Sequence, residues 1–346
     1  MLTWRAATEH ALYGPDGFFR RPDTGPGRHF RTSAHASDHF ARAMVRLLVD
    51  VDESLGHPPA LDLVDVGAGR GELLAQVVGL AATGHVPASL VQRLHLTAVE
   101  RAPRPVDLPD AIAWQPELPR GIVGLLVANE WLDNVPLDVV ARVDDAWRVV
   151  LVDPDDGRES LGSPPDASSA QWLASWWPAT SAQPGDRAEV GLTRDAAWAS
   201  AVRCIRRGVA VAVDYAHNRE ERAAGRWSTG SLAAFRDGRE VEPVPDGTCD
   251  LTTHVSLDSC AAAGLMGGAT ASHVTTQRAA LLALGLDAGR PDLGLAAADP
   301  ARYVRELVRA GEVAELIDRD GLGGFGWLIQ ARGVELPPTL SGTPLA

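Results

Sequence analysis

Short apolar runs bounded by turn residues recur along the chain, and amphipathic stretches lie between them. Apolar runs of about four to eight residues are typical of buried strands, whereas a period of about 3.6 residues predicts helices. The predicted strands lie at 61–66, 94–100, 111–115, 121–128, 139–143, 147–152, 208–213, 271–274 and 325–331. The predicted helices lie at 38–49, 72–78, 193–206, 277–285 and 299–318, and Thr193 is expected to cap the third of them. Strands that alternate with helices indicate an α/β chain with a doubly wound sheet.

The length of 346 residues exceeds one average domain, so we expect one large domain or two unequal ones. The predicted divisions are an N-terminal flap and helix at 1–50, a core at 51–335 and a disordered tail at 336–346. Insertions into the core are predicted at about 153–190 and 216–265, and a helical segment at about 277–320. Residues 218–262 look irregular, and a long excursion after a central strand is typical of a lid or substrate subdomain.

Composition and charge narrow the functional classes. No run approaches the roughly 18 apolar residues of a membrane span. The first residues lack a basic head followed by an apolar stretch, so we expect no signal peptide and a cytoplasmic protein. The three cysteines form no C-x-x-C pair, which favours reduced thiols and suggests no metal site. The net charge of −13 disfavours nucleic-acid binding; it is compatible with a cationic substrate or simply with solubility.

A glycine-rich corner follows the predicted strand 61–66. The segment Gly67-Ala68-Gly69-Arg70-Gly71 leads straight into a helix, and such corners bind nucleotides in doubly wound sheets. A dinucleotide fingerprint needs G-x-G-x-x-G, whereas the third glycine here comes one residue earlier. Asp65 precedes the first glycine by two residues; its carboxylate would repel a pyrophosphate and attract the ammonium and sulfonium of S-adenosylmethionine (SAM). The corner favours a SAM site, with a dinucleotide site and a structural turn as the alternatives.

Polar residues at the ends of the next two strands extend this candidate site. Glu100 ends the second strand, where an acid takes the ribose hydroxyls in nucleotide-binding α/β sheets. Trp114 or Gln115, at the end of the third strand, is a candidate to face an adenine. Core packing of Trp114 is the equal alternative.

Acidic residues also follow two strands that belong in the middle of the sheet. Asn129, Glu130 and Asp133 come directly after one buried run, and Asp214 and His217 come after another. Ligands of open α/β sheets bind beyond the carboxyl ends of the strands, so these side chains are expected near the glycine corner. Two acids and an amide after a buried run favour a functional role over a solvated face.

Several motifs together resemble one known family. In chain order they are Gly17-Phe18-Phe19, Phe30-x-Thr32-Ser33, Asp65-Val66-Gly67-Ala68-Gly69-Arg70-Gly71, Asn129-Glu130-Trp131-Leu132-Asp133-Asn134-Val135-Pro136, Asp214-Tyr215, Gly230-Ser231-Leu232 and Asp250-Leu251-Thr252-Thr253-His254-Val255. From about residue 11 to 331 the chain resembles the MidA family of SAM-dependent methyltransferases, whose eukaryotic members are mitochondrial complex I assembly factors.

The resemblance implies a class I methyltransferase fold, which is Rossmann-like with a seven-stranded, mostly parallel sheet, an N-terminal flap and a smaller substrate subdomain. It implies SAM as cofactor and a protein arginine as methyl acceptor. The glycine corner then corresponds to the methionine site, Glu100 to the ribose ligand, and Phe30, Thr32 and Ser33 to the flap over SAM. Glu130 and Asp133 correspond to acids that orient the guanidinium, with Asp214 and His217 as secondary catalytic candidates.

The chain also departs from the family pattern. The family's Gly-Asp-Phe becomes His29-Phe30, its Thr-Ser-Pro-Glu ends here as Ser33-Ala34-His35, and its Asp-Tyr-Gly becomes Asp214-Tyr215-Ala216. If the lost acids help to hold a guanidinium in the family, the substrate here has changed. A small-molecule methyltransferase and a SAM-binding assembly protein without catalysis therefore stay open, as does a homodimer; an NAD-linked oxidoreductase fits least well.

Overall fold

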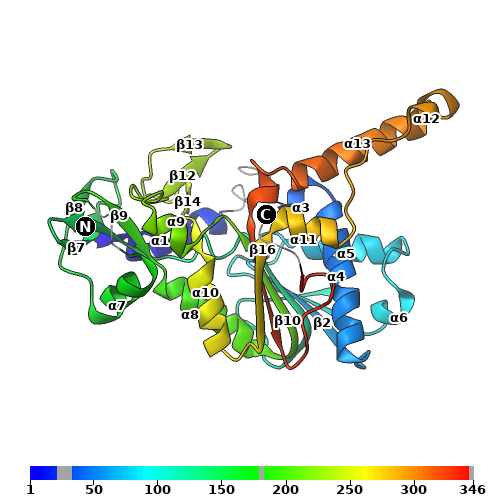
Figure 1. The fold of residues 1–346 in the computed structure, drawn as a ribbon, viewed down its shortest axis with the longest axis horizontal. Helices are drawn as coiled ribbons and strands as arrows, with labels where there is room; N and C mark the ends of the chain where they lie inside the picture. Colours follow the sequence, from blue (N-terminus) through cyan, green and yellow to red (C-terminus); the bar gives the residue numbers. More distant parts are fainter. Residues whose placement is uncertain (22–32, 179–182, 343–346) are drawn as a thin grey trace.

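The computed structural model describes residues 1–21, 33–178 and 183–342, which form a larger α/β lobe and a smaller lobe rich in strands (Figure 1). The helices are α1 (Trp4–Tyr13), α3 (Ser33–Ala36), α4 (His39–Leu55), α5 (Glu72–Ala82), α6 (Ala88–Val91), α7 (Ala167–Trp176), α8 (Leu192–Cys204), α9 (Arg219–Ala223), α10 (Leu257–Met266), α11 (Gln277–Ala283), α12 (Leu293–Ala298) and α13 (Pro300–Leu316). Two 3₁₀ turns, η1 (Phe18–Arg20) and η2 (Leu322–Gly324), are also described.

A seven-stranded sheet forms the larger lobe, in the order β16-β17-β10-β5-β2-β3-β4. Its strands are β2 (Leu61–Val66), β3 (Leu94–Val99), β4 (Ile112–Gln115), β5 (Ile122–Asn129), β10 (Ile205–Asp214), β16 (Ala271–Thr276) and β17 (Gly326–Arg332). The strands from β10 to β4 are parallel, whereas β17 runs antiparallel to both of its neighbours. This arrangement confirms the predicted fold class, and it brings the carboxyl ends of β2, β3, β5 and β10 to one edge.

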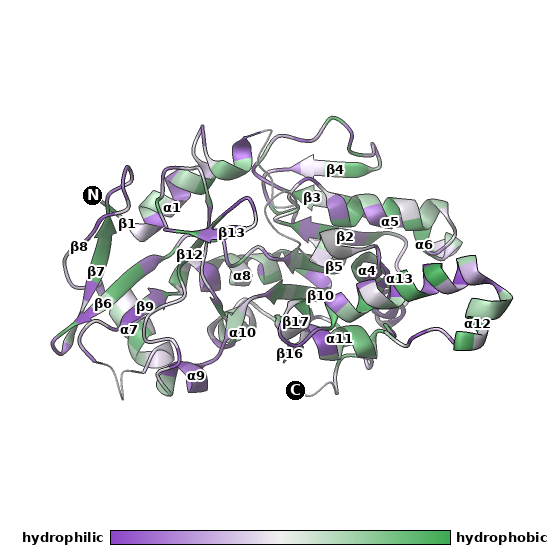
Figure 2. Ribbon diagram, turned by 90° about the horizontal axis from the view of Figure 1, so that it is seen from above, coloured by the Kyte–Doolittle hydropathy of each residue, from purple (hydrophilic) through white to green (hydrophobic). Residues whose placement is uncertain are grey.

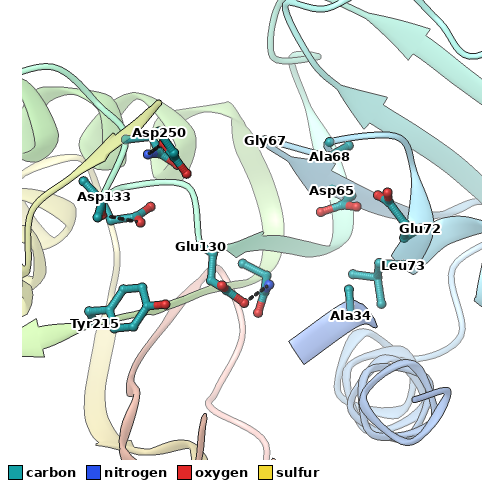
Figure 3. Close-up of a pocket in the computed structure, with 14 residues that line it drawn as sticks. Ala34, Asp65, Gly67, Ala68, Glu72, Leu73, Glu130, Asp133, Tyr215 and Asp250 are labelled. Carbon is teal, nitrogen blue, oxygen red and sulfur yellow. Dashed lines mark hydrogen bonds between the residues drawn. The ribbon is translucent and has the colours of Figure 1, made fainter. Parts of the chain in front are cut away.

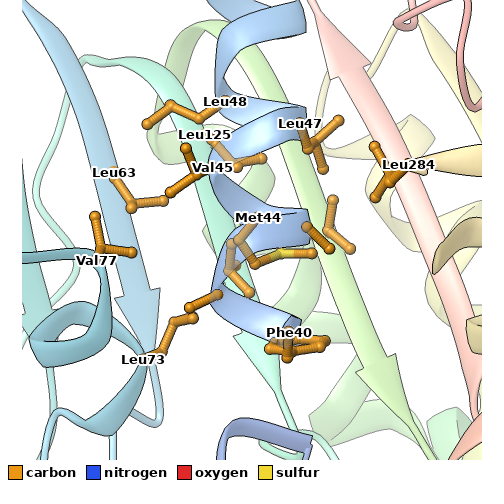
Figure 4. Close-up of a cluster of buried hydrophobic side chains, with 14 of the residues drawn as sticks. Phe40, Met44, Val45, Leu47, Leu48, Leu63, Leu73, Val77, Leu125 and Leu284 are labelled. Carbon is orange, nitrogen blue, oxygen red and sulfur yellow. The ribbon is translucent and has the colours of Figure 1, made fainter. Parts of the chain in front are cut away.

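Helices cover both faces of this sheet. Alternate residues of β2 belong to two hydrophobic cores, with Leu61 and Leu63 in one and Val64 and Val66 in the other, as the side-chain alternation of a strand requires. The first core is closed by α4 and α5, and the second by α8 and α10. Figure 4 shows Met44 of α4 among the side chains of the first core.

The smaller lobe is assembled from three separate parts of the chain. Its main sheet has the order β1-β7-β6-β9, with β8 paired to β7, and a second sheet has the order β13-β12-β14. These strands are β1 (Leu2–Thr3), β6 (Asp138–Val143), β7 (Ala146–Val152), β8 (Glu159–Leu161), β9 (Arg187–Val190), β12 (Ala233–Arg236), β13 (Arg239–Val241) and β14 (Asp250–Thr252). Seen from above, α8 and α10 lie between the two lobes (Figure 2). The hairpin predicted across Asp144-Asp145 is confirmed as β6 and β7.

Two expectations about local structure were wrong, namely the irregular segment 218–262 and the cap at Thr193. The segment 218–262 contains α9, β12 to β14, the short pair β11 (Ala216–His217) and β15 (Val255–Ser256), and the start of α10. Its strands span only two to four residues each, so the sequence shows no clear alternation of apolar and polar positions. Helix α8 begins at Leu192, so its cap position is Gly191, which has no side chain, and Thr193 lies inside the helix with its hydroxyl donating to the Pro136 carbonyl (2.6 Å).

The expected disorder of the tail does not hold for residues 336–342. Leu340 is fully buried against the first core, and the Thr339 hydroxyl donates to Asp50 of α4 (2.7 Å). Within the described ranges, no helix is long and apolar enough to cross a membrane.

Candidate functional site

A cavity lies at the carboxyl edge of the large sheet, where the two lobes meet (Figure 3). Acidic side chains from several elements line it: Asp65, Glu72, Glu130, Asp133 and Asp250. Its described wall contains no lysine, arginine or histidine. Such a wall favours a cationic ligand, because a cation offsets the mutual repulsion of the carboxylates.

The glycine corner forms one side of this cavity. Gly67, Gly69 and Gly71 all have positive φ angles, which non-glycine residues adopt only with strain. A Cβ on Gly67 would lie 2.7 Å from Trp131, and one on Gly71 would lie 2.6 Å from Leu108. Gly67, Ala68 and Gly69 line the cavity, whereas Gly71 packs against Leu108 and serves the shape of the turn.

Asp65 and Glu72 face the same part of the cavity from the end of β2 and the start of α5 (Figure 3). Burial raises the pKa of Asp65 well above its ordinary value, and the charges of Glu72 and Glu100 raise it further. A cationic group bound between Asp65 and Glu72 would stabilise the ionised forms of both.

A second cavity continues from the first, since both are lined by Gly67, Gly69, Glu130 and Asn134. Glu100 lies in it, held by backbone amides: Gly69 N donates to Oε2 (3.1 Å), and Arg101 N (2.6 Å) and Ala102 N (3.0 Å) donate to Oε1. The carboxylate of Glu100 is thereby fixed beside the glycine corner, and its assignment to the ribose stays a prediction.

Neither of the two residues predicted to face an adenine, Trp114 and Gln115, lines either cavity. Gln115 is absent from both cavity walls, because its side chain donates to the carbonyl of Glu117 (2.8 Å). The following residues 116–118 line the second cavity instead. Trp114 packs against the first core and donates to Ala102 O (3.0 Å), so the packing alternative for Trp114 is confirmed.

Glu130 sits where the two cavities join. Its φ of 51° is unusual for a residue other than glycine and costs about 1 kcal/mol, a kind of strain often found at functional sites. Its Oε1 accepts hydrogen bonds from Ser33 N (3.0 Å) and Asn129 Nδ2 (3.0 Å). Ser33 thus joins the N-terminal segment to the site, and Ala34 lines the cavity beside it.

The remaining predicted flap residues cannot be placed. Phe30 and Thr32 lie outside the described residues, as does His29.

Asp133 and Asp250 form the wall that the smaller lobe contributes (Figure 3). Asp133 Oδ2 accepts a hydrogen bond from the Thr252 hydroxyl (2.7 Å), and Asp250 Oδ1 accepts one from Asn134 Nδ2 (2.9 Å). Asp133 Oδ1 is buried and has no hydrogen-bond partner within residues 1–21, 33–178 and 183–342. Burial raises the pKa of both carboxyls. An unpartnered buried acceptor on a cavity wall suits a donor group of a ligand.

Asp214 supports the site without lining it. Its Oδ2 accepts hydrogen bonds from the backbone amides of Leu132 (2.9 Å) and Asp133 (3.2 Å), and the residue is fully buried. It therefore fixes the turn that carries Asp133.

His217 lies outside both cavities, between Trp177 and Trp227. Its Nδ1 accepts a hydrogen bond from Arg222 (2.8 Å), because an arginine can only donate. Burial and the Arg222 charge lower the pKa of His217 to about 2, so the ring stays neutral. The structure thus does not bring the predicted base to the acids.

Several lining residues were missed as site candidates, namely Glu72, Asn134, Tyr215, Asp250 and Thr252. Tyr215, Asp250 and Thr252 stand in recognisable motifs. Tyr215 follows β10, next to β5, whereas Asp250 and Thr252 belong to β14, which pairs with β12 in the smaller lobe. No group of three metal-ligating side chains suited to an ion occurs in the described parts of the chain.

Comparisons with known proteins add independent findings. The model of a family described as "Putative S-adenosyl-L-methionine-dependent methyltransferase" matches residues 43–275, more than half of the chain. The search of curated proteins returned no match.

Two solved structures from Burkholderia thailandensis resemble the chain over almost its whole length. One holds S-adenosylhomocysteine; it is 25% identical, covers 99% of this chain and 91% of its own, and superposes with a TM-score of 0.80. The other, an uncharacterised protein of the same superfamily, is 24% identical, with coverages of 99% and 90% and a TM-score of 0.78.

Proposed function

Because the chain belongs to the family of S-adenosyl-L-methionine-dependent methyltransferases whose model it matches, we propose that it transfers a methyl group from SAM to a guanidinium nitrogen of a protein arginine. The membership confirms the fold class, the cofactor and the family resemblance inferred from the motifs. The acceptor is our proposal. It rests on one observation: among the residues that the structure describes, the cavity beside the glycine corner is lined by carboxylates and by no basic side chain.

The residues of the two cavities fit the parts of SAM. Asp65 and Glu72 suit the cationic methionine end, and Glu100 suits the ribose hydroxyls. A Cβ on Gly69 would lie 3.2 Å from Glu72 Oε2, so the glycine avoids a tight contact with this carboxylate. Bound SAM supplies a methyl group already activated by its sulfonium. The protein therefore has to position the acceptor nitrogen, stabilise charge and keep competing water away.

Glu130, Asp133 and Asp250 are the groups available for the acceptor. A guanidinium presents its N–H donors in a planar fork, which carboxylates bind in a fixed orientation. Asp133 Oδ1 accepts no hydrogen bond from the described residues. Carboxylates placed on the outer nitrogens would draw the positive charge toward themselves and leave electron density on the nitrogen that reacts. Asp133 and Asp250, whose pKa values are raised by burial, are suited to accept the proton that this nitrogen releases.

Glu130→Gln tests the assignment. We expect methyl transfer from radiolabelled SAM to protein to fall by about 100-fold or more, because an oriented charge contact is lost. We expect the affinity for S-adenosylhomocysteine, measured by calorimetry, to stay unchanged. Glu306→Gln on α13 makes the same chemical change at a surface ion pair with Arg302 and should leave both quantities unaltered.

Other results would redirect the assignment. An equal loss of cofactor affinity would move Glu130 into the cofactor site. Methylarginine in hydrolysed product protein supports the proposal. A labelled small metabolite without labelled protein would replace the arginine acceptor by a small molecule.

A further inference from the structure

Arg194 of α8 is buried directly behind the acid wall. Its guanidinium donates to the backbone carbonyls of Val135 (3.2 Å), Thr253 (3.0 Å) and His254 (2.9 Å), and also to that of Asp133. These carbonyls belong to two segments, one following β5 and the other following β14. Arg194 therefore joins the two segments that carry the acids of the wall.

This arginine has no carboxylate partner at ion-pair distance among the residues that the structure describes. Buried arginines usually have one, since an isolated buried charge is costly. Arg222 illustrates the usual case: it is equally buried but pairs with Asp258 (2.9 Å). The charge of Arg194 is thus balanced only at longer range, by the acids in front of it.

We propose that Arg194 is a positioning residue of the acceptor pocket: it joins the two acid-bearing segments through their backbone carbonyls and places a positive charge behind the buried Asp133. The inference rests on the proposed function in one respect, namely that the pocket holds a cationic acceptor. Arg194 itself lies outside the wall of the acid cavity and is not expected to touch the acceptor.

The electrostatic environment of Asp133 supports this role. Burial raises the pKa of Asp133, whereas the Thr252 hydroxyl and the Arg194 charge lower it. Further titratable groups that interact with Asp133 are Asp214 and Tyr215 at the end of β10, Asp250 of β14 and Tyr13 of α1. Glu130 lines the same cavity. All of these are acids, so any charge they carry opposes the ionisation that Arg194 favours.

The decisive measurement is the titration of the Asp133 carboxyl by carbon NMR on aspartate-labelled protein, with Asp133→Asn to identify its resonance. In Arg194→Met we expect the midpoint for Asp133 to rise by about one pH unit or more, because a nearby positive charge is lost. Arg222→Met removes an equally buried arginine that contacts Trp176 and Asp258 instead, and should leave the midpoint unchanged. An unchanged midpoint in Arg194→Met, or an equal rise in both variants, would overturn the proposal.

Arg194→Lys keeps the test valid if the methionine variant does not fold. It retains the charge but cannot bridge four carbonyls. We expect the Asp133 midpoint to stay near that of the wild type, while binding of agmatine, a guanidinium compound without a carboxylate, to the S-adenosylhomocysteine complex weakens. Agmatine binding as tight as in the wild type would contradict the positioning role. If the wild type itself binds no agmatine, the proposed acceptor fails, whereas the Asp133 titration still decides the role of Arg194.

Discussion

At the scale of single residues, three acids of the site are held by different kinds of partner. Glu100 is fixed by backbone amides, Asp133 by a hydroxyl and Asp250 by an amide side chain. Asp214, which the sequence suggested as a catalytic group, instead holds the turn that carries Asp133. A carboxylate after a strand is therefore informative about the location of a site, but its role depends on which groups its oxygens contact.

Gly67→Ala is expected to damage the cofactor site. The new Cβ would lie 2.7 Å from the Trp131 ring at a φ of 69°, so the corner and Trp131 must both shift. We expect calorimetry to show a loss of S-adenosylhomocysteine affinity of about tenfold or more, equivalent to about 1.4 kcal/mol. Gly84→Ala is the matched control, because Gly84 has a similar φ of 75° with no atom near the added Cβ. Equal affinities for S-adenosylhomocysteine in both variants would show that the close approach of Trp131 to Gly67 does not matter for cofactor binding.

At the scale of elements, the large sheet was readable from its apolar runs, whereas the smaller lobe was not. Strands such as β5 and β10 are nearly all buried, so their composition alone marks them. The strands β12 and β14 are short, and their pairing spans a connection that includes β13. The local pattern of apolar and polar residues does not indicate which strands pair. For this reason the sequence did not predict Asp250 and Thr252 at the site.

The terminal segment gives a second test at this scale. Leu340 is fully buried against the first core, so Leu340→Ala should lower the free energy of unfolding by about 2 kcal/mol through lost burial. Ser341→Ala at the exposed neighbouring position should stay within about 0.5 kcal/mol of the wild type. Denaturant titration measures both. A Leu340→Ala protein as stable as the wild type would mean that this segment is detached in solution, as the sequence suggested.

At the scale of the whole molecule, the two lobes meet along the cavities. Arg101, next to the ribose candidate Glu100, reaches across to α1 of the smaller lobe. Its guanidinium lies 4.2 Å from the centre of the Tyr13 ring and forms an ion pair with Glu9 (2.5 Å). Tyr13 and Glu9 line the second cavity, so this contact joins the lobes where the cofactor's nucleoside belongs.

Arg101→Ala is therefore expected to weaken S-adenosylhomocysteine binding by about fivefold, or about 1 kcal/mol, which is typical of a partly exposed cation–π contact with an ion pair. The effect should diminish at high salt, because the ion pair is screened. Arg5→Ala removes an ion pair with Asp138 that lies within the smaller lobe, and should leave the affinity unchanged. Calorimetry at low and high salt distinguishes the two variants. Unchanged affinity in Arg101→Ala would show that the contact of Arg101 with α1 does not contribute to cofactor binding.

The sequence by itself determined the α/β fold, the SAM corner and the acids at the strand ends, because buried strands and glycine turns leave local signatures. Only the tertiary structure decided how those acids are used. In the structure, Asp214 accepts hydrogen bonds from backbone amides, and His217 is buried beside Arg222. Asp250 and Thr252 lie next to Asp133. Arg194 belongs to no recognisable motif in the sequence, yet in the structure it is buried behind the acids of the cavity. Hydrogen bonds and electrostatic interactions between distant residues depend on position in space, and a linear pattern does not encode that position.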